Sequence, residues 1–143
     1  MSAAIRVTRV ASRQELEKAF SIRLRVFVRE QGVPKEIELD DDDASAAHFL
    51  ALLGESAVGT ARLAMHGNNA KIGRMAVLRH YRRKGVGREL LKRAVKLAQR
   101  RKAKTIFLNA QVSAIGFYER LGFSCVGPVF DEAGIPHRKM VLE

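Results

Sequence analysis

The sequence predicts an α/β (α+β) domain with a single mixed, mostly antiparallel central sheet of about six to seven strands flanked by helices. Three observations carry this prediction. Apolar segments bounded by turn residues occur at His48–Leu53 and Ala57–Met65, as in an antiparallel meander. A strand, a glycine-containing turn and an amphipathic helix then run from Lys71 to Arg101. The apolar segment Thr105–Ala110 follows that helix, and such a crossover places it parallel to the strand before the turn.

Length and composition predict one domain over residues 1–143, because domains commonly hold about 100–150 residues. No apolar run is long enough to span a membrane and the first residues lack the apolar part of a secretory signal, so we expect a cytoplasmic location. Cys125 is the single cysteine, which excludes an intrachain disulfide. The histidines have no metal-ligand spacing, so no metal site is predicted: they are His48, His66, His80 and His137.

The formal net charge of +11 is unevenly distributed along the chain. Between Lys71 and Lys104 the only acidic residue is Glu89, whereas residues 36–43 contain six acids and no base. A basic surface of this strength attracts anions, including nucleic acid and coenzyme phosphates. Charge alone does not choose between these two classes of ligand.

The first helix is predicted from its cap and its apolar spacing. Ile5–Val10 alternates like a half-buried strand, and Ser12 with Glu15 then forms a capping-box pattern. The helix is expected to end near Gly32–Pro34, with arginines on its outer faces at Arg23, Arg25 and Arg29. Its buried face is predicted to hold Leu16, Ala19, Phe20, Leu24, Phe27 and Val28.

The remaining strands are bounded by turn residues. Turns are expected at Gly54-Glu55, at Gly67–Asn69 and at Asp131–Gly134. The strands that they separate are predicted at His48–Leu53, Ala57–Met65, Lys71–Val77, Thr105–Ala110, Ser124–Val126 and His137–Leu142.

The turn between Leu78 and Gly87 is suited to bind a diphosphate. Gly85 and Gly87 let a ligand approach the backbone closely, and the N–H groups of a helix beginning near Val86 have no intrahelical acceptor. Cationic side chains stand on both sides of the glycines, at Arg82, Arg83, Lys84 and Arg88. Neither the Walker loop nor the dinucleotide fingerprint fits this spacing.

Three segments resemble one family in the family's own order. Arg82-x-x-Gly85-x-Gly87 resembles the pyrophosphate-binding signature of the GNAT acyl-CoA N-acyltransferase superfamily. Ile22–Pro34 is similar to the pattern I-R-x-x-V-F-V-x-E-Q-x-V-P of its ElaA/YjcF-like branch of small bacterial proteins. Ser113–Phe123 resembles the A-x-x-F-Y-x-x-x-G-F ending of GNAT domains, and Leu108–Gln111 resembles the L-x-A-Q of the same branch.

This resemblance implies a GNAT fold with a splayed parallel strand pair, and an acyltransferase that uses acetyl-CoA as co-substrate and no metal. A primary amine would attack the thioester directly. Tyr118 would be the general acid that protonates the departing thiolate. The resemblance, with the chemistry of the turn, places the coenzyme at Met75, Ala76, Val77, Arg82, Arg83, Lys84, Gly85, Val86, Gly87, Arg88, Asn109, Ser113 and Phe117.

Two roles stay open at this point. Glu30 is a candidate general base because it ends the helix expected to border the acceptor, but pairing with Arg25 or Arg29 is an equal alternative. The acidic residues 36–43 are either a solvated loop or a lip that attracts a cationic acceptor.

Two other functions are weighed against acetyl transfer. The basic stretch Arg79–Arg101 is the phosphate-tracking face that a nucleic-acid-binding module would need, but few aromatic residues are available for stacking. A GNAT fold that binds CoA without turnover is the second alternative. The expected partner is a small-molecule or peptide amine, without membrane or nucleic acid, and a homodimer is left open.

Overall fold

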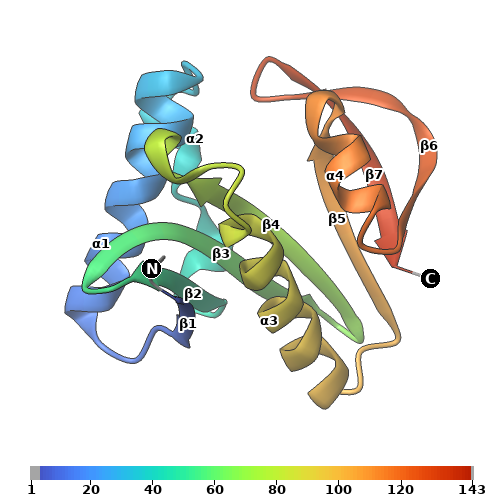
Figure 1. Cartoon of the computed structure of the whole chain (residues 1–143). Coiled ribbons are helices and arrows are strands. Elements are labelled where there is room, and N and C mark those ends of the chain that lie inside the picture. Colours follow the sequence, from blue (N-terminus) through green and yellow to red (C-terminus); the bar gives the residue numbers. More distant parts are fainter. Residues whose placement is uncertain (1–3, 143) are drawn as a thin grey trace.

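Seven strands form one sheet in the order β1-β2-β3-β4-β5-β7-β6 in the computed structural model, which describes residues 4–142 (Figure 1). Only β4 and β5 pair in parallel, and every other neighbouring pair is antiparallel. The predicted mixed sheet is therefore confirmed. The strands are β1 (Ile5–Arg9), β2 (Ala47–Leu53), β3 (Ser56–His66), β4 (Asn69–Val77), β5 (Thr105–Gln111), β6 (Phe123–Glu132) and β7 (Ile135–Leu142).

The first helix begins at the predicted cap, where the Ser12 side chain accepts a hydrogen bond from the Glu15 N–H at 3.1 Å. It continues as a π-helix, a form that is often found at functional sites. None of the helices within residues 4–142 has the length and apolar character that a membrane span requires. The helical segments are α1 (Arg13–Arg23), the π-helix η1 (Leu24–Glu30), α2 (Lys35–Glu38), the 3₁₀ turns η2 (Asp41–Ala44), η3 (Arg79–Tyr81) and η4 (Val112–Ala114), α3 (Val86–Arg100) and α4 (Ile115–Glu119).

Each face of the sheet is covered by a different helix (Figure 1). Along β2, Phe49 and Ala51 join the core beneath α3, whereas Leu50 joins the core beneath α1. This alternation follows from the two-residue period of a strand. The helix after the glycine turn is amphipathic, as predicted, and the residues of α3 that are buried are Val86, Leu90, Leu91, Ala94 and Ala98.

A β-bulge interrupts β4 in the middle of the sheet. Arg74 and Met75 together oppose the single residue Ala61 of β3. Arg74 has a φ of 49°, in the left-handed region that is costly for a residue with a side chain. The extra residue reverses the alternation of β4, so Met75 packs on the core beneath α3 and Ala76 on the core beneath α1.

The parallel pair β4/β5 separates beyond its first residues. Pairing runs from Asn69 opposite Thr105 to Ile72 opposite Leu108 and then stops, although both strands continue. Figure 1 shows the two strands diverging from that point. Residues 73–77 of β4 thus have no partner on β5, and the sheet is open between its halves.

A buried arginine ties α1 to the acidic segment that precedes β2. The Arg23 Nε donates to Glu38 Oε1 at 2.7 Å and its Nη1 donates to Asp43 Oδ1 at 2.7 Å. Only 1% of Arg23 and 2% of Glu38 are exposed. The prediction that Arg23 lies on an outer face of the helix is therefore wrong, because two carboxylates from residues 36–43 compensate its burial.

Two more arginines extend this ion network to β3 and β4. Arg62 contacts Asp40 at 2.5 Å and Asp43 at 3.1 Å, and Arg74 contacts Glu38 at 3.4 Å and Asp40 at 3.2 Å. The network thus joins three arginines to three carboxylates. Neither the solvated-loop nor the lip interpretation describes these three acids, because their charges are already paired within the protein.

The ion network sets the pKa of Asp43. Burial opposes the charged form, but hydrogen bonds from Arg23, from the Asp40 N–H and from Arg62 outweigh it and lower the pKa of Asp43 to about 2. A carboxyl whose pKa falls on folding stabilises the fold at pH values above its unfolded pKa near 4. That contribution is lost as the pH falls from about 4 toward 2.

We predict that Asp43→Asn lowers the free energy of unfolding at pH 7 by roughly 3 kcal/mol, because it leaves Arg23 buried with one fewer carboxylate. The difference from wild type should shrink as the pH falls below about 4. Urea titrations at several pH values measure both effects. Asp41→Asn, at an exposed neighbour, is the control and should change little; an equal loss in both variants would contradict the network's role.

Candidate functional site

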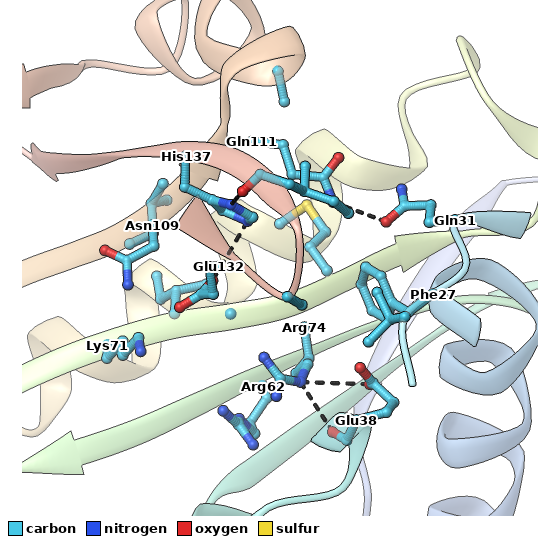
Figure 2. A pocket seen from close by; sticks show the side chains of 18 of the residues that line it. Phe27, Gln31, Glu38, Arg62, Lys71, Arg74, Asn109, Gln111, Glu132 and His137 are labelled. Carbon is cyan, nitrogen blue, oxygen red and sulfur yellow. Dashed lines mark hydrogen bonds and ion pairs between the residues drawn. The ribbon is translucent and has the colours of Figure 1, made fainter. Parts of the chain in front are cut away.

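A cavity of about 410 Å³ occupies the opening between β4 and β5 (Figure 2). This volume lies in the range of small-ligand sites. One wall comes from the π-helix and the loop after it, with Phe27, Gln31 and Val33. The strand walls and the α4 side contribute Lys71, Ile72, Gly73, Arg74, Met75, Leu108, Asn109, Gln111, Ala114 and Tyr118, and the β6–β7 hairpin adds Glu132, Ala133, Ile135 and His137.

One side-chain hydrogen bond bridges the two halves of the site. Gln111, at the end of β5, donates from Nε2 to Gln31 Oε1 at 2.9 Å (Figure 2). Gln31 belongs to the wall beside β4, so the bond joins the two elements that the diverging strands separate. The two walls of the opening are therefore in direct contact at this end.

Tyr118 enters the cavity from α4, on the side of the sheet that α3 covers. Its hydroxyl donates to Met75 Sδ at 3.9 Å, and sulfur is only a weak acceptor. The ring packs edge-on against Phe117 and Phe123. Burial raises the pKa of the Tyr118 hydroxyl to about 12, so the group keeps its proton at every pH at which the protein would be assayed.

The glycine turn has the geometry predicted for an anion site. Gly85 is the N-cap of α3 and has a φ of 88°, in the left-handed region that favours glycine. A Cβ on Gly87 would come within 3.3 Å of Phe117 Cζ, so glycine at this position lets α3 approach α4 closely. Three cationic side chains around the start of the helix are exposed: Arg83, Lys84 and Arg88.

Arg82 is half-buried and hydrogen-bonded within the protein, unlike the exposed cations Arg83, Lys84 and Arg88 of the same turn. Its Nη1 and Nη2 donate to Glu30 Oε2 and Oε1 at 2.6 and 2.8 Å, and its Nε donates to the Val77 carbonyl at 2.8 Å. The hydrogen bond from Arg82 lowers the pKa of Glu30. Glu30 is not among the residues lining the cavity. Arg82 therefore holds the turn against the end of η1 and the end of β4.

The other predicted coenzyme residues differ in whether their side chains or only their backbone atoms are accessible to a ligand. Met75 and Asn109 line the cavity, and Ser113 is exposed on η4. The side chains of Ala76 and Val86 are buried in the two cores, so only their backbone atoms are available to a ligand. The roles assigned to all of these residues, and to Tyr118 and Glu30, stay predictions.

Several polar residues of the cavity were missed by the sequence analysis. Lys71, Glu132 and His137 line it together with Asn109, and Figure 2 shows them on one side of it. Lys71 lies on β4, and the other two lie on β6 and β7. The available signal was the position of Lys71 in a strand of otherwise small and apolar residues. Within residues 4–142, no cluster of three or more His, Cys, Asp or Glu side chains could hold a metal ion.

Comparison with known proteins covers almost the entire chain. The family model "Acetyltransferase (GNAT) domain" matches residues 8–143. The uncharacterized N-acetyltransferase YjcF of Bacillus subtilis (strain 168) is 37% identical over 131 residues, which is 91% of this chain and 94% of YjcF. The crystal structure of Escherichia coli ElaA has a TM-score of 0.87 at 27% identity, covering 98% of this chain and 100% of that one.

A third similar protein is an acyl-CoA N-acyltransferase from Pseudomonas aeruginosa. Its crystal structure has a TM-score of 0.83 at 29% identity and covers 99% of this chain and 100% of that chain. The resemblance predicted from the three sequence segments is confirmed by these matches.

Proposed function

Because the chain belongs to the GNAT acetyltransferase family, we propose that it transfers an acetyl group from acetyl-CoA to a primary amine by direct attack. The observation that carries this proposal is the continuity of the site. The unpartnered edge of β4 leads from the cavity toward the glycine turn at the N-terminus of α3. A long coenzyme with a reactive end and a diphosphate end needs such an arrangement.

The diphosphate is held at the glycine turn. The free N–H groups at the start of α3 favour an anion, and Arg83, Lys84 and Arg88 add full positive charges. Arg82 acts as a positioning residue, because all three of its nitrogens already donate to Glu30 and Val77. This division of roles explains why one of the four cations is half-buried while the other three are exposed.

The pantetheine arm lies along the open edge of β4. Its amides can hydrogen-bond to the backbone of residues 73–76, which β5 leaves without a partner. The thioester then lies beside Met75, next to the Tyr118 hydroxyl. A backbone N–H of this segment is available to polarise the thioester carbonyl.

Tyr118 assists the departure of the coenzyme. The amine nitrogen forms a bond to the thioester carbon, the C–S bond breaks, and the electron pair stays on sulfur. Tyr118 now donates to Met75 Sδ, a weak acceptor that a thiolate would readily replace. Because its pKa is about 12, the hydroxyl is protonated when the thiolate forms.

Glu30 is disfavoured as the general base by its surroundings. Its two carboxylate oxygens accept from Arg82, which lowers its pKa and weakens it as a proton acceptor. Its contacts instead support a structural role, in which it orients Arg82 and thus the glycine turn.

We predict that Glu30→Gln keeps kcat within about threefold of wild type and leaves the shape of the kcat pH profile unchanged. Steady-state kinetics from pH 6 to 9 measure both, and Glu36→Gln, at an exposed acid, is the control. A large fall in kcat together with loss of the acidic limb of the profile would restore Glu30 as the base.

We predict that Tyr118→Phe lowers kcat on the order of 10²-fold or more and nearly preserves acetyl-CoA affinity, because it deletes only the proton donor. Thiol release with a panel of amines measures kcat, and calorimetry measures affinity. Tyr81→Phe is the matched control, since Tyr81 is the only other tyrosine and contacts Lys84 through its ring.

Full kcat in Tyr118→Phe would reduce Tyr118 to a packing residue. Acetyl-CoA binding without thiol release for any amine would favour the binder without turnover. Absence of acetyl-CoA binding altogether would favour the nucleic-acid alternative.

A further inference from the structure

One side of the cavity carries four polar side chains that an acceptor could meet. Lys71, Asn109, Glu132 and His137 line it from the four strands β4, β5, β6 and β7 (Figure 2). In β4 and β5, Lys71 and Asn109 alternate with Ile72 and Leu108, which point into the core beneath α3. The two polar side chains therefore extend from the opposite face of the sheet.

The arginines and carboxylates of the ion network lie beside these four side chains, and their opposite charges largely cancel. Arg62 and Arg74 line the cavity, but each contacts carboxylates of residues 36–43. Lys71 differs, because no carboxylate within the described part of the chain lies within 4.0 Å of its ammonium group. Lys71 is thus the cation of the cavity that retains its charge for a ligand.

Glu132 and His137 form a pair whose carboxylate supplies a negative charge on the same side of the cavity as the positive charge of Lys71. The His137 Nδ1 is 2.7 Å from the Ile135 carbonyl oxygen, so this nitrogen carries a proton and donates it there. The Nε2 is 3.4 Å from Glu132 Oε2. A proton that arrives on Nε2 would be held facing a carboxylate, and 40% of the Glu132 side chain is exposed toward solvent and ligand.

We propose that the acceptor is an amine that also carries an anionic group, a carboxylate or a phosphate, which Lys71 binds while Glu132 binds the ammonium. This inference rests on the proposed acetyl transfer. The Glu132–His137 pair takes one proton from the ammonium, and the neutral nitrogen attacks the thioester. The second proton lost by nitrogen balances the one that the thiolate gains, so the reaction releases one proton per amide formed.

This acceptor differs from the cationic one that the acidic segment suggested. The acids of that segment that reach the cavity, Glu38 and Asp40, are paired with arginines. One unpaired cation and one accessible carboxylate remain, and together they complement a molecule with both charges. A carboxylate and a phosphate share the chemistry that Lys71 recognises, and the experiment separates them.

The test uses matched amines that differ only in the anionic group. Hexylamine is compared with 6-aminohexanoate, and ethanolamine with β-alanine and phosphoethanolamine, in a thiol-release assay with acetyl-CoA. We expect kcat/KM at least about tenfold higher for an amine that carries the anionic group than for its counterpart without that group. Lys71→Met should remove most of this preference and Lys71→Arg should retain it. Lys18→Met, at an exposed position on α1, is the control.

A second readout does not require turnover. The melting temperature of the protein with CoA is measured with and without each amine, because a bound ligand stabilises the folded state. Anionic amines should raise it in wild type and not in Lys71→Met. A preference for amines without an anionic group, indifference to Lys71→Met, or no thermal shift by any amine that carries an anionic group would overturn the inference. A Lys71-dependent shift without thiol release would support binding of the anionic group by Lys71 and would contradict the proposed transfer.

Discussion

The end of hydrogen bonding between β4 and β5 is the constraint on which the rest of the site depends. After Ile72 and Leu108 the two strands diverge, and this leaves one strand edge without a partner in the centre of the sheet. An unpaired edge inside a sheet costs free energy unless something binds there. The cavity is reached by Tyr118 from one side of the sheet and by Lys71 from the other. A donor and an acceptor can therefore meet through the sheet.

The ion network maintains this opening from the side of α1. Arg74 is held with a positive φ at the bulge, where its guanidinium contacts Glu38 and Asp40. The bulge turns Met75 toward Tyr118, so the contact between these two residues depends on carboxylates that lie far from both in the sequence. A buried network of this kind contributes little net stability, but removal of one member is costly. The network instead fixes the shape of one wall of the cavity.

The parts of the structure that the sequence predicted are those set by local patterns. The strand alternation, the cap at Ser12 and the glycine turn before α3 depend on neighbouring residues. The three segments that resemble GNAT proteins predicted the fold family. Contacts between distant residues could not be read from periodicity. Arg23 pairs with Glu38 across 15 positions, so an arginine predicted to be exposed is buried. Glu30 pairs with Arg82 across 52 positions, a contact that the sequence analysis did not predict. The polar lining residues Glu132 and His137 were missed for the same reason, since the hairpin that carries them reaches the cavity only in the folded sheet.

We propose that the turn before α3 binds the coenzyme diphosphate, and calorimetric titration of acetyl-CoA into Gly85→Asn and Gly85→Asp tests this binding. Asn and Asp have the same size and share the strain of the left-handed φ. Among residues 4–142, a Cβ at this position meets only Ile5 Cδ1 within 4 Å, at 3.8 Å. The two variants therefore differ in one negative charge at the N-terminus of α3. We expect Gly85→Asn to weaken acetyl-CoA binding moderately and Gly85→Asp nearly to abolish it. Equal affinity of the two variants for acetyl-CoA would contradict a diphosphate site at this turn.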